Sequence, residues 1–202
     1  MRFAKLVIAT KNKGKYTEFK EIITNTAGRN FADEIIFAPD AAELVVEETG
    51  KTYAENAMLK ARAWAEETRL PCLADDSGLE VMALGGAPGV YSSRVVRGRD
   101  VDRAAWLLSK LSKETYRRAR FAAALSLCVP GEYTIITEGY CKGSIAEHPS
   151  GENGFGYDPV FIPDGYDHTF AELSSGVKNE ISHRAEAFRK LSEILSPQTM
   201  GD

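Results

Sequence analysis

The chain has 202 residues, of which 44% are hydrophobic and 27% charged, as in an ordinary soluble globular protein with a sizeable core. Its formal net charge of −4 argues against a sequence-independent nucleic-acid binder, which needs a basic surface. It does not exclude a nucleotide enzyme, because a few lysines and arginines can hold one polyphosphate. No signal-peptide core or bilayer-spanning run is present in the sequence. We therefore expect a single domain over residues 1–202, located in the cytoplasm, with no nucleic-acid or membrane partner.

The order of apolar and polar segments predicts an α/β fold with a mixed sheet. Short apolar runs bounded by turns are typical of strands, and apolar residues at spacings of three and four are typical of helices. Thr52 and Glu55 predict a capping box at the start of one helix. The expected strands are Lys5 to Thr10, Glu34 to Ala38, Leu79 to Leu84, Ala119 to Val129, Tyr133 to Ile145 and Val160 to Ile162, and the expected helices begin at Lys15 and cover Thr52 to Thr68, Asp102 to Leu111 and His183 to Leu195.

A polar segment follows the first predicted strand and leads into the first predicted helix. Backbone N–H groups at a helix N-terminus point toward whatever lies there, and the helix dipole favours an anion. The segment therefore predicts a phosphate site, although it lacks the spacing of a Walker A loop. The alternative is an ordinary polar turn with solvated lysines. Its residues are Thr10, Lys11, Asn12, Lys13, Gly14 and Lys15.

Two adjacent acids, Asp75 and Asp76, follow a short apolar run and precede Ser77 and Gly78. Successive side chains of a strand point to opposite faces, but this need not hold at the turn that we expect here, so the sequence leaves open whether the two carboxylates converge. Magnesium prefers a few carboxylates together with phosphate oxygens and water, and an aspartate can accept a proton from an attacking water. The alternative is an Asx-turn that closes a strand. Glu47 and Glu48 are further carboxylates, but only the fold could bring this acidic loop near Asp76.

A glycine-rich loop runs from Glu147 to Asp158 and carries Phe155 and Tyr157. Glycines allow the backbone to approach a ligand closely, and exposed aromatic rings suit stacking on a base. The alternative is a tight turn pinned by two core aromatics.

The last segment of interest runs from Lys178 to Arg184. Ser182 is a predicted N-cap for the final helix, so His183 and Arg184 lie in its first turn, where a cation opposes the dipole. Because this position is unfavourable for a cation, a compensating role is expected. A surface arginine is the alternative.

Together, these segments resemble the inosine triphosphate pyrophosphatase family, also called XTP/dITP diphosphatases. The resemblance covers nearly the whole chain and keeps the order of the motifs. The matching segments are Thr10-x-Asn12-x-x-Lys15, Glu47-Glu48-Thr49-Gly50, Glu55-Asn56-Ala57 with Lys60-Ala61, Ala74 to Leu79, Gly85 to Ser92, Phe155 to Pro159 and Ser182-His183-Arg184.

The resemblance implies an elongated mixed β-sheet flanked by helices, with two lobes around a central cleft, and a homodimer. It also implies Mg²⁺-assisted hydrolysis of ITP, dITP and XTP to the monophosphate and pyrophosphate. Asp76 would be the proton acceptor and a metal ligand, with Glu47 rather than Glu48 as the second ligand. The residues from Thr10 to Lys15 would contact phosphate, with Lys60 as a further candidate. The other substrate contacts implied are Ser77, Phe155, Gly156, Tyr157, Asp158, Lys178, His183 and Arg184.

In this account water attacks the α-phosphorus, and pyrophosphate leaves with its charge held by Lys15 and the metal. His183 and Arg184 would donate to the carbonyl at the six-position of the base, which adenine lacks. Two other interpretations remain open from the sequence. One is a pyrophosphatase with a different nucleotide preference, and the other is a nucleotide-binding protein without catalysis.

Overall fold

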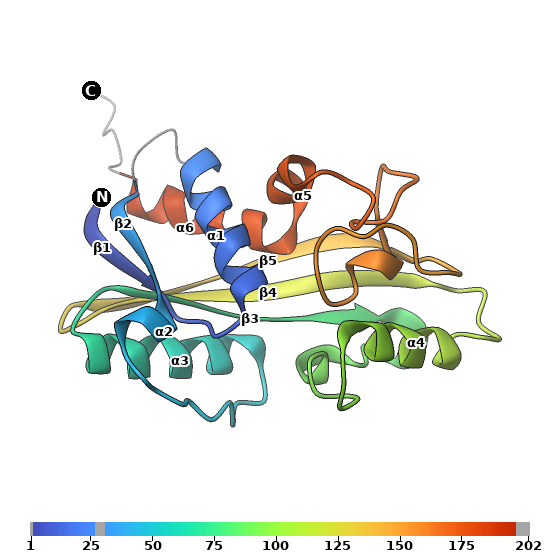
Figure 1. The fold of residues 1–202 in the computed structure, drawn as a ribbon, viewed down its shortest axis with the longest axis horizontal. Coiled ribbons are helices and arrows are strands. Elements are labelled where there is room, and N and C mark those ends of the chain that lie inside the picture. Colours follow the sequence, from blue (N-terminus) through green and yellow to red (C-terminus); the bar gives the residue numbers. More distant parts are fainter. Residues whose placement is uncertain (1, 27–30, 197–202) are drawn as a thin grey trace.

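The computed structural model describes residues 2–26 and 31–196 and contains a six-stranded mixed sheet in the order β2-β1-β3-β4-β5-β6 (Figure 1). Helices cover both faces of this sheet. The strands are β1 (Phe3–Ile8), β2 (Ala32–Phe37), β3 (Cys72–Val81), β4 (Arg118–Val129), β5 (Tyr133–Ile145) and β6 (Phe161–Pro163). The α-helices are α1 (Lys13–Thr26), α2 (Ala38–Ala41), α3 (Tyr53–Thr68), α4 (Asp100–Lys110), α5 (Ser175–Ile181) and α6 (His183–Leu195), and the 3₁₀ turns are η1 (Met82–Leu84), η2 (Gly89–Tyr91) and η3 (Asp158–Val160).

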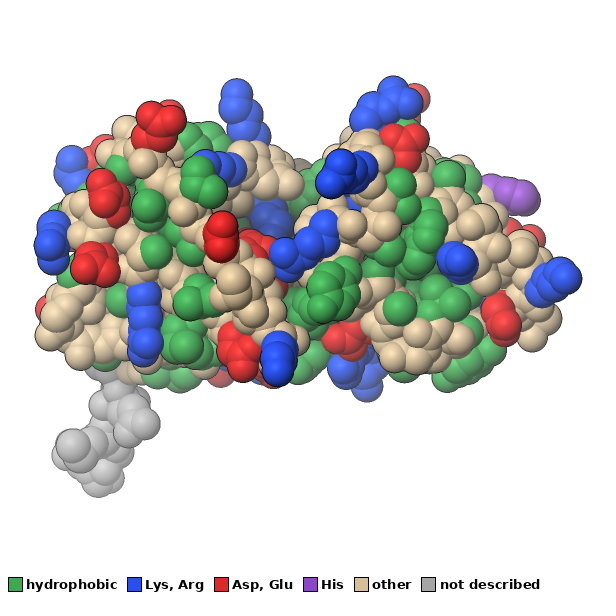
Figure 2. Space-filling view, turned by 90° about the horizontal axis from the view of Figure 1, so that it is seen from below, with side chains coloured by type: hydrophobic (Ala, Val, Ile, Leu, Met, Phe, Trp, Pro, Cys, Tyr) green, Lys and Arg blue, Asp and Glu red, His purple; other side chains and the backbone are tan. Residues whose placement is uncertain are grey.

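The long axis of the molecule is set by β3, β4 and β5, which pair antiparallel along their lengths. At one end, β1 and β2 add in parallel, with α1 and α6 on one face of the sheet and α3 on the other (Figure 1). At the other end, α4 lies on the same face as α3. The space-filling view shows a notch between the two ends, with charged side chains gathered in it (Figure 2). The expected fold, an elongated mixed sheet with two lobes, is confirmed.

Separate apolar cores stabilise the two ends. Phe19, Ile22 and Phe188 pack between α1, α6 and the sheet, whereas Leu107 and Phe161 belong to the core beside α4. The polar side chains that are buried lie mostly between these cores. They include Glu18, Asp75, Asp76, Asp158, Lys178, His183 and Arg184. Burying so many charged groups is costly unless they are paired, which marks this middle region as the place to look for function.

The turn expected from Asp75 to Gly78 is absent, and that prediction is wrong. β3 runs without a break from Cys72 to Val81, and every residue of it has a partner on β4. The pairing with a strand some fifty positions further along the chain overrides the local turn preference of the Asp-Asp-Ser-Gly sequence. The strand expected from Leu79 to Leu84 ends at Val81, where η1 begins.

Helix ends are where the sequence was most informative. The Thr52 and Glu55 capping box is present at the start of α3, and Ser182 accepts a hydrogen bond from Ala185 N as the N-cap of α6.

The helix α5 was not predicted from the sequence. It has only 7 residues and includes a glycine, so it offers little helical periodicity. None of the helices in the described part of the chain has the length and apolar character needed to cross a membrane.

Candidate active site

The site lies along β3, at the point where its neighbour β1 ends. In the described part of the chain, β1 pairs with β3 at Val7 with Cys72 and at Ile8 with Leu73. The chain then leaves the sheet at Thr10 and enters α1. Beyond Leu73, the edge of β3 that faced β1 is therefore open, and the side chains of α1, α3 and α6 converge on it.

Because β3 is a regular strand, Asp75 and Asp76 point to opposite faces of the sheet. Asp75 faces α1 and α6, where it contacts Lys15 and Arg184. Asp76 faces α3, where it contacts Asn56 and lies near Lys60. The two neighbouring acids therefore belong to two different networks.

Asp75 is the anchor of the first network. Its Oδ2 accepts hydrogen bonds from Lys15 Nζ at 3.0 Å, Arg184 Nε at 3.2 Å and Ser77 Oγ at 3.1 Å. Arg184 also donates to Ser77 Oγ at 2.8 Å. Burial opposes ionisation of Asp75, but the adjacent Lys15 and Arg184 hold the pKa of its carboxyl well below the ordinary value. Asp75 thus places two cations on the open side of the strand.

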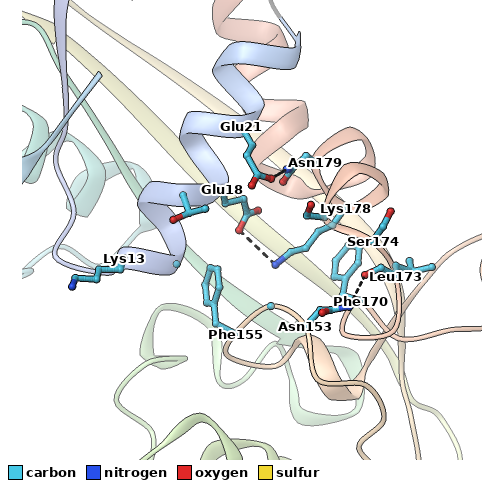
Figure 3. Close-up of a pocket in the computed structure, with 14 residues that line it drawn as sticks. Lys13, Glu18, Glu21, Asn153, Phe155, Phe170, Leu173, Ser174, Lys178 and Asn179 are labelled. Carbon is cyan, nitrogen blue, oxygen red and sulfur yellow. Dashed lines mark hydrogen bonds and ion pairs between the residues drawn. The ribbon is translucent and has the colours of Figure 1, made fainter. Parts of the chain in front are cut away.

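Glu18 of α1 extends this network. Its Oε2 lies 3.3 Å from Arg184 Nη1 and 3.5 Å from Lys178 Nζ. Lys178 in turn donates to Asp158 Oδ2 at 2.6 Å, and Figure 3 shows Glu18 and Lys178 pointing toward one another beside Phe155. These contacts explain how a cation is tolerated in the first turn of α6, because Arg184 is balanced by two buried carboxylates.

Asp76 belongs to the second network, which α3 supplies. Asn56 Nδ2 donates to Asp76 Oδ2 at 2.9 Å, and Lys60, one turn further along the helix, places its Nζ 3.9 Å from Asp76 Oδ1. Lys60 also donates to Glu48 Oε1 at 2.6 Å. Burial raises the pKa of Asp76 above its ordinary value, against the opposing effects of Lys60 and Asn56. Asp76 is therefore a stronger base than an exposed aspartate.

Asn56 also fixes the acidic loop that precedes α3. Its Oδ1 accepts from Gly50 N at 2.8 Å, and a Cβ at Gly50 would lie only 2.6 Å from that oxygen, so glycine is required there. This arrangement brings Glu48 to the cavity beside Asp76, while Glu47 is exposed. The placement is the reverse of the expectation, which gave the position beside Asp76 to Glu47.

The polar turn before α1 is locally ordered. Thr10 Oγ1 accepts from Asn12 N at 3.1 Å, and Asn12 Oδ1 accepts from Lys15 N at 3.1 Å. A Cβ at Gly14 would lie 2.8 Å from Phe155 Cδ1, so this glycine lets the first turn of α1 lie against the aromatic loop. The turn thereby joins the cationic part of the site to its aromatic part.

Aromatic rings form the other end of the site. The Phe155 ring has Lys178 Nζ at 4.6 Å and the Arg184 guanidinium at 5.4 Å from its centroid. His183 stacks on Phe121 with ring centroids 4.8 Å apart. Burial, together with Arg184 and Lys178, lowers the pKa of His183 well below its ordinary value, so the ring is neutral at neutral pH. Its buried Nδ1 has no hydrogen-bond partner within the described residues.

Two cavities share Phe155 as a wall, one of about 550 Å³ and one of about 150 Å³. Of the residues predicted from the sequence, the larger is lined by Lys13, Gly14, Phe155 and Lys178 (Figure 3). The smaller is lined by Asn12, Lys15, Asp76, Ser77, Phe155, Gly156, Tyr157, Asp158, His183 and Arg184. Thr10, Lys11, Lys60 and Glu47 line neither, although Lys60 contacts two lining residues, Glu48 and Asp76.

The network around Asp76 offers oxygen donors for a divalent cation. Among residues 2–26 and 31–196, no cluster of three or more His, Cys, Asp or Glu side chains could enclose a metal. Two carboxylates, from Glu48 and Asp76, line the same cavity and share Lys60 as a cationic neighbour. Two carboxylates with space for phosphate oxygens and water suit Mg²⁺, which is seldom held by a cage of protein ligands alone. The residues present fit a magnesium ion that arrives with a polyphosphate.

Several residues of the site were not singled out from the sequence. Asn56 carries the clearest signal, since it lies four residues before Lys60 on the same helical face. Glu18 and Asp100 gave no local signal, because Arg184 and Gly156, which they contact in the site, come from segments far away in the chain. Asp75 was noticed, but its role as an anchor for Lys15 and Arg184 depends on β3 being a strand.

A cation-rich turn at a helix N-terminus, paired carboxylates and an aromatic wall around one cleft define a protein that binds a phosphorylated, ring-containing ligand. The Ham1 family model matches residues 6–194, and the chain belongs to the Ham1 family. This membership confirms the family expected from the sequence.

Relatives with similar sequences include the dITP/XTP pyrophosphatase of Bacillus licheniformis, 48% identical over 198 residues, covering 94% of this chain and 97% of that protein. The dITP/XTP pyrophosphatase of Aquifex aeolicus is 45% identical over 95% of this chain and 96% of its own. Among solved structures, the Ham1 protein of Staphylococcus aureus has a TM-score of 0.80 and 41% identity, covering 95% of this chain and 97% of that one. The HAM1 protein of Coxiella burnetii has a TM-score of 0.81 and 38% identity, covering 96% of this chain and 98% of that one.

Proposed function

We propose that this protein hydrolyses the non-standard purine nucleoside triphosphates ITP, dITP and XTP to the nucleoside monophosphate and pyrophosphate. The names of the relatives support the reaction class. The observation that carries the proposal is the position of Asp76. This basic carboxylate lines a cavity together with Glu48, Lys15, Phe155 and His183.

The triphosphate binds at the Lys15 end of the cavity. Asn12 and the N-terminal turn of α1 offer amide donors, and Lys15 and Lys60 offer positive charge. Lys60 changes partners on binding, because its present partners, Glu48 and Asp76, are the groups proposed to hold a cation. Glu48, not Glu47, is the proposed companion of Asp76 at this position.

Mg²⁺, when bound by Asp76 and Glu48, supplies positive charge that offsets the charge of the phosphates. The protein's own contribution to the chemistry is Asp76. Its carboxylate accepts a proton from a water molecule as the water oxygen bonds to the α-phosphorus. The bond from the α-phosphorus to the bridging oxygen breaks, and that oxygen leaves with pyrophosphate. Asn56 holds the carboxylate in place through its 2.9 Å hydrogen bond.

The base lies against Phe155, near His183 and Arg184. Arg184 is a donor, and the neutral His183 ring can donate through one nitrogen and accept through the other. A carbonyl at the six-position of the base satisfies such a donor. An amine would leave a buried donor unpaired, at a cost of about 1–3 kcal/mol. This preference for the carbonyl distinguishes hypoxanthine and xanthine from adenine.

The reaction is tested by hydrolysis of ITP in ¹⁸O-labelled water. Attack at the α-phosphorus puts the label in IMP and leaves pyrophosphate unlabelled. Label in pyrophosphate would place the attack at the β-phosphorus, and release of IDP with phosphate would rule out the proposed reaction.

The Glu48→Gln variant is expected to need at least tenfold more Mg²⁺ for half-maximal activity than the unmodified protein, since a neutral amide is a weaker ligand for a hard cation. The matched control is Glu47→Gln, which makes the same change at the adjacent, exposed residue and should leave the Mg²⁺ requirement within twofold. The measurement is the rate of ITP hydrolysis against Mg²⁺ concentration. The opposite ranking of the two variants would give the ligand position to Glu47.

We further propose that residues 1–202 act as one catalytic domain, that two copies form a homodimer, and that the protein works in the cytoplasm, where its nucleotide substrates are made. Light scattering coupled to gel filtration tests the dimer.

A further inference from the structure

The loop that carries Phe155 is fastened to the segment that leads into α4. Tyr157 Oη donates to Ser92 O at 3.0 Å, and Gly156 N donates to Asp100 Oδ2 at 2.6 Å. The second contact joins two residues 56 positions apart in the chain. Both Asp100 and Gly156 line the smaller cavity. The wall on which the base is proposed to lie is thus held by the neighbouring helix.

Asp100 uses both of its carboxylate oxygens. While Oδ2 accepts from Gly156 N, Oδ1 pairs with the guanidinium of Arg103, one turn along α4. Arg103 is itself held by a 2.9 Å hydrogen bond from Nη1 to Gly98 O, and only 16% of its side chain is exposed. A carboxylate oriented by a fixed cation has little freedom, so the amide that it accepts from is fixed as well.

The cap of α4 does not account for Asp100. Asp102 fills that role, because its Oδ2 accepts from Arg99 N, the backbone of the N-cap residue, at 2.8 Å. Both aspartates lie in the first turn, where the helix dipole stabilises a negative charge. Asp100 differs from Asp102 in that it accepts a hydrogen bond from Gly156 N in the loop that carries Phe155.

We propose that Asp100 is a positioning residue that orients the loop from Phe155 to Asp158, and thereby sets the affinity for the base without affecting the phosphate end of the site. The inference rests on the proposed function, because it assumes that the base lies against Phe155. It predicts that loss of Asp100 weakens the binding of a ligand that has a base and leaves the binding of a ligand without a base unchanged. A general structural role would weaken both.

The test compares Asp100→Asn with its matched control, Asp102→Asn. Each removes one negative charge from the first turn of α4. Binding of IMP and of inorganic pyrophosphate, both with Mg²⁺, is measured by calorimetry. Asp100→Asn replaces the carboxylate by a neutral amide, so the hydrogen bond from Gly156 N loses its charge assistance and the amide cannot pair with Arg103 as an anion. It should weaken IMP about tenfold and leave pyrophosphate within twofold. Asp102→Asn should change neither, and the KM for ITP should rise in Asp100→Asn with kcat nearly unchanged.

Equal weakening of IMP and pyrophosphate, or no weakening of IMP, would overturn the inference. If Asp100→Asn fails to fold, Arg103→Gln takes its place. It leaves the bond to Gly156 but frees the carboxylate, and should weaken IMP about threefold in the same selective way. Failure of the unmodified protein to hydrolyse ITP would contradict the proposed function itself, which separates that outcome from a failure of the Asp100 inference.

Discussion

Replacing Asp76 with asparagine should lower kcat for ITP by about a thousandfold, within the range that a positioned general base contributes. The amide cannot accept the proton from water, but it keeps the size of the side chain and can still contact Asn56 and Lys60. At saturating Mg²⁺, which offsets the weaker ligand that the amide provides, ITP should therefore bind with an affinity within about fivefold of that of the unmodified protein, since Lys15, Phe155 and the rest of the cavity are untouched. Single-turnover hydrolysis and equilibrium binding, measured separately, check the two parts.

The dependence of kcat/KM on pH gives a second test of Asp76 as the base. Burial raises the pKa of Asp76, and the base works only when deprotonated, so kcat/KM should fall as the pH drops through a value above that of an ordinary aspartate. The residual activity of Asp76→Asn should lack this acidic limb. A near-normal kcat in the variant, or an unchanged acidic limb, would remove Asp76 from the central role.

Replacing Asp75 with asparagine should destabilise the fold by about 3–5 kcal/mol, the cost of leaving buried charges without their partner. Lys15 would lose the carboxylate that it contacts, and the buried Arg184 would lose one of its two carboxylate partners and keep Glu18. The matched control is Asp164→Asn, which breaks an exposed pair with Arg118 and should cost no more than about 1 kcal/mol. Urea unfolding measures both. A loss of less than about 1 kcal/mol at Asp75 would contradict its role as the anchor.

The stabilisation by Asp75 should also depend on pH with a definite sign. Because its pKa is lower in the folded protein than in the unfolded chain, the contribution is present above the unfolded value of about 4 and is lost as the pH falls through the folded value. The difference in stability between the unmodified protein and Asp75→Asn should therefore shrink as the pH is lowered below about 4.

The parts of the fold that depend on local sequence were predictable. The capping box at Thr52 and the α6 helix follow from residues within a few positions of each other. The full length of the β3 strand could not be predicted in this way. The Asp75 to Gly78 segment has the composition of a turn and becomes a strand only through its pairing with β4. Once that strand exists, the alternation of side chains separates Asp75 from Asp76, which no local pattern could show.

The same reasoning applies to the candidate site. The motifs found its two ends, the turn at Lys15 and the loop at Phe155, because each is short and compositionally unusual. They could not decide between Glu47 and Glu48, since the choice depends on how Asn56 holds the loop through Gly50 N. Glu18 and Asp100 were missed because each acts on a segment that is distant in the sequence and adjacent in the fold.

The measurement that tests the central claim most directly is pyrophosphate release from ITP, XTP, dITP, GTP, ATP and dUTP, each with and without Mg²⁺. We expect Mg²⁺-dependent release from ITP, XTP and dITP, and little from ATP, whose base has an amine at the six-position. Guanine shares the carbonyl, so the low release that we expect from GTP must come from discrimination against its two-amino group. Equal rates on all six would keep the chemistry but contradict the account of base recognition. No release from any would contradict the proposed reaction and leave a protein that binds nucleotides without hydrolysing them.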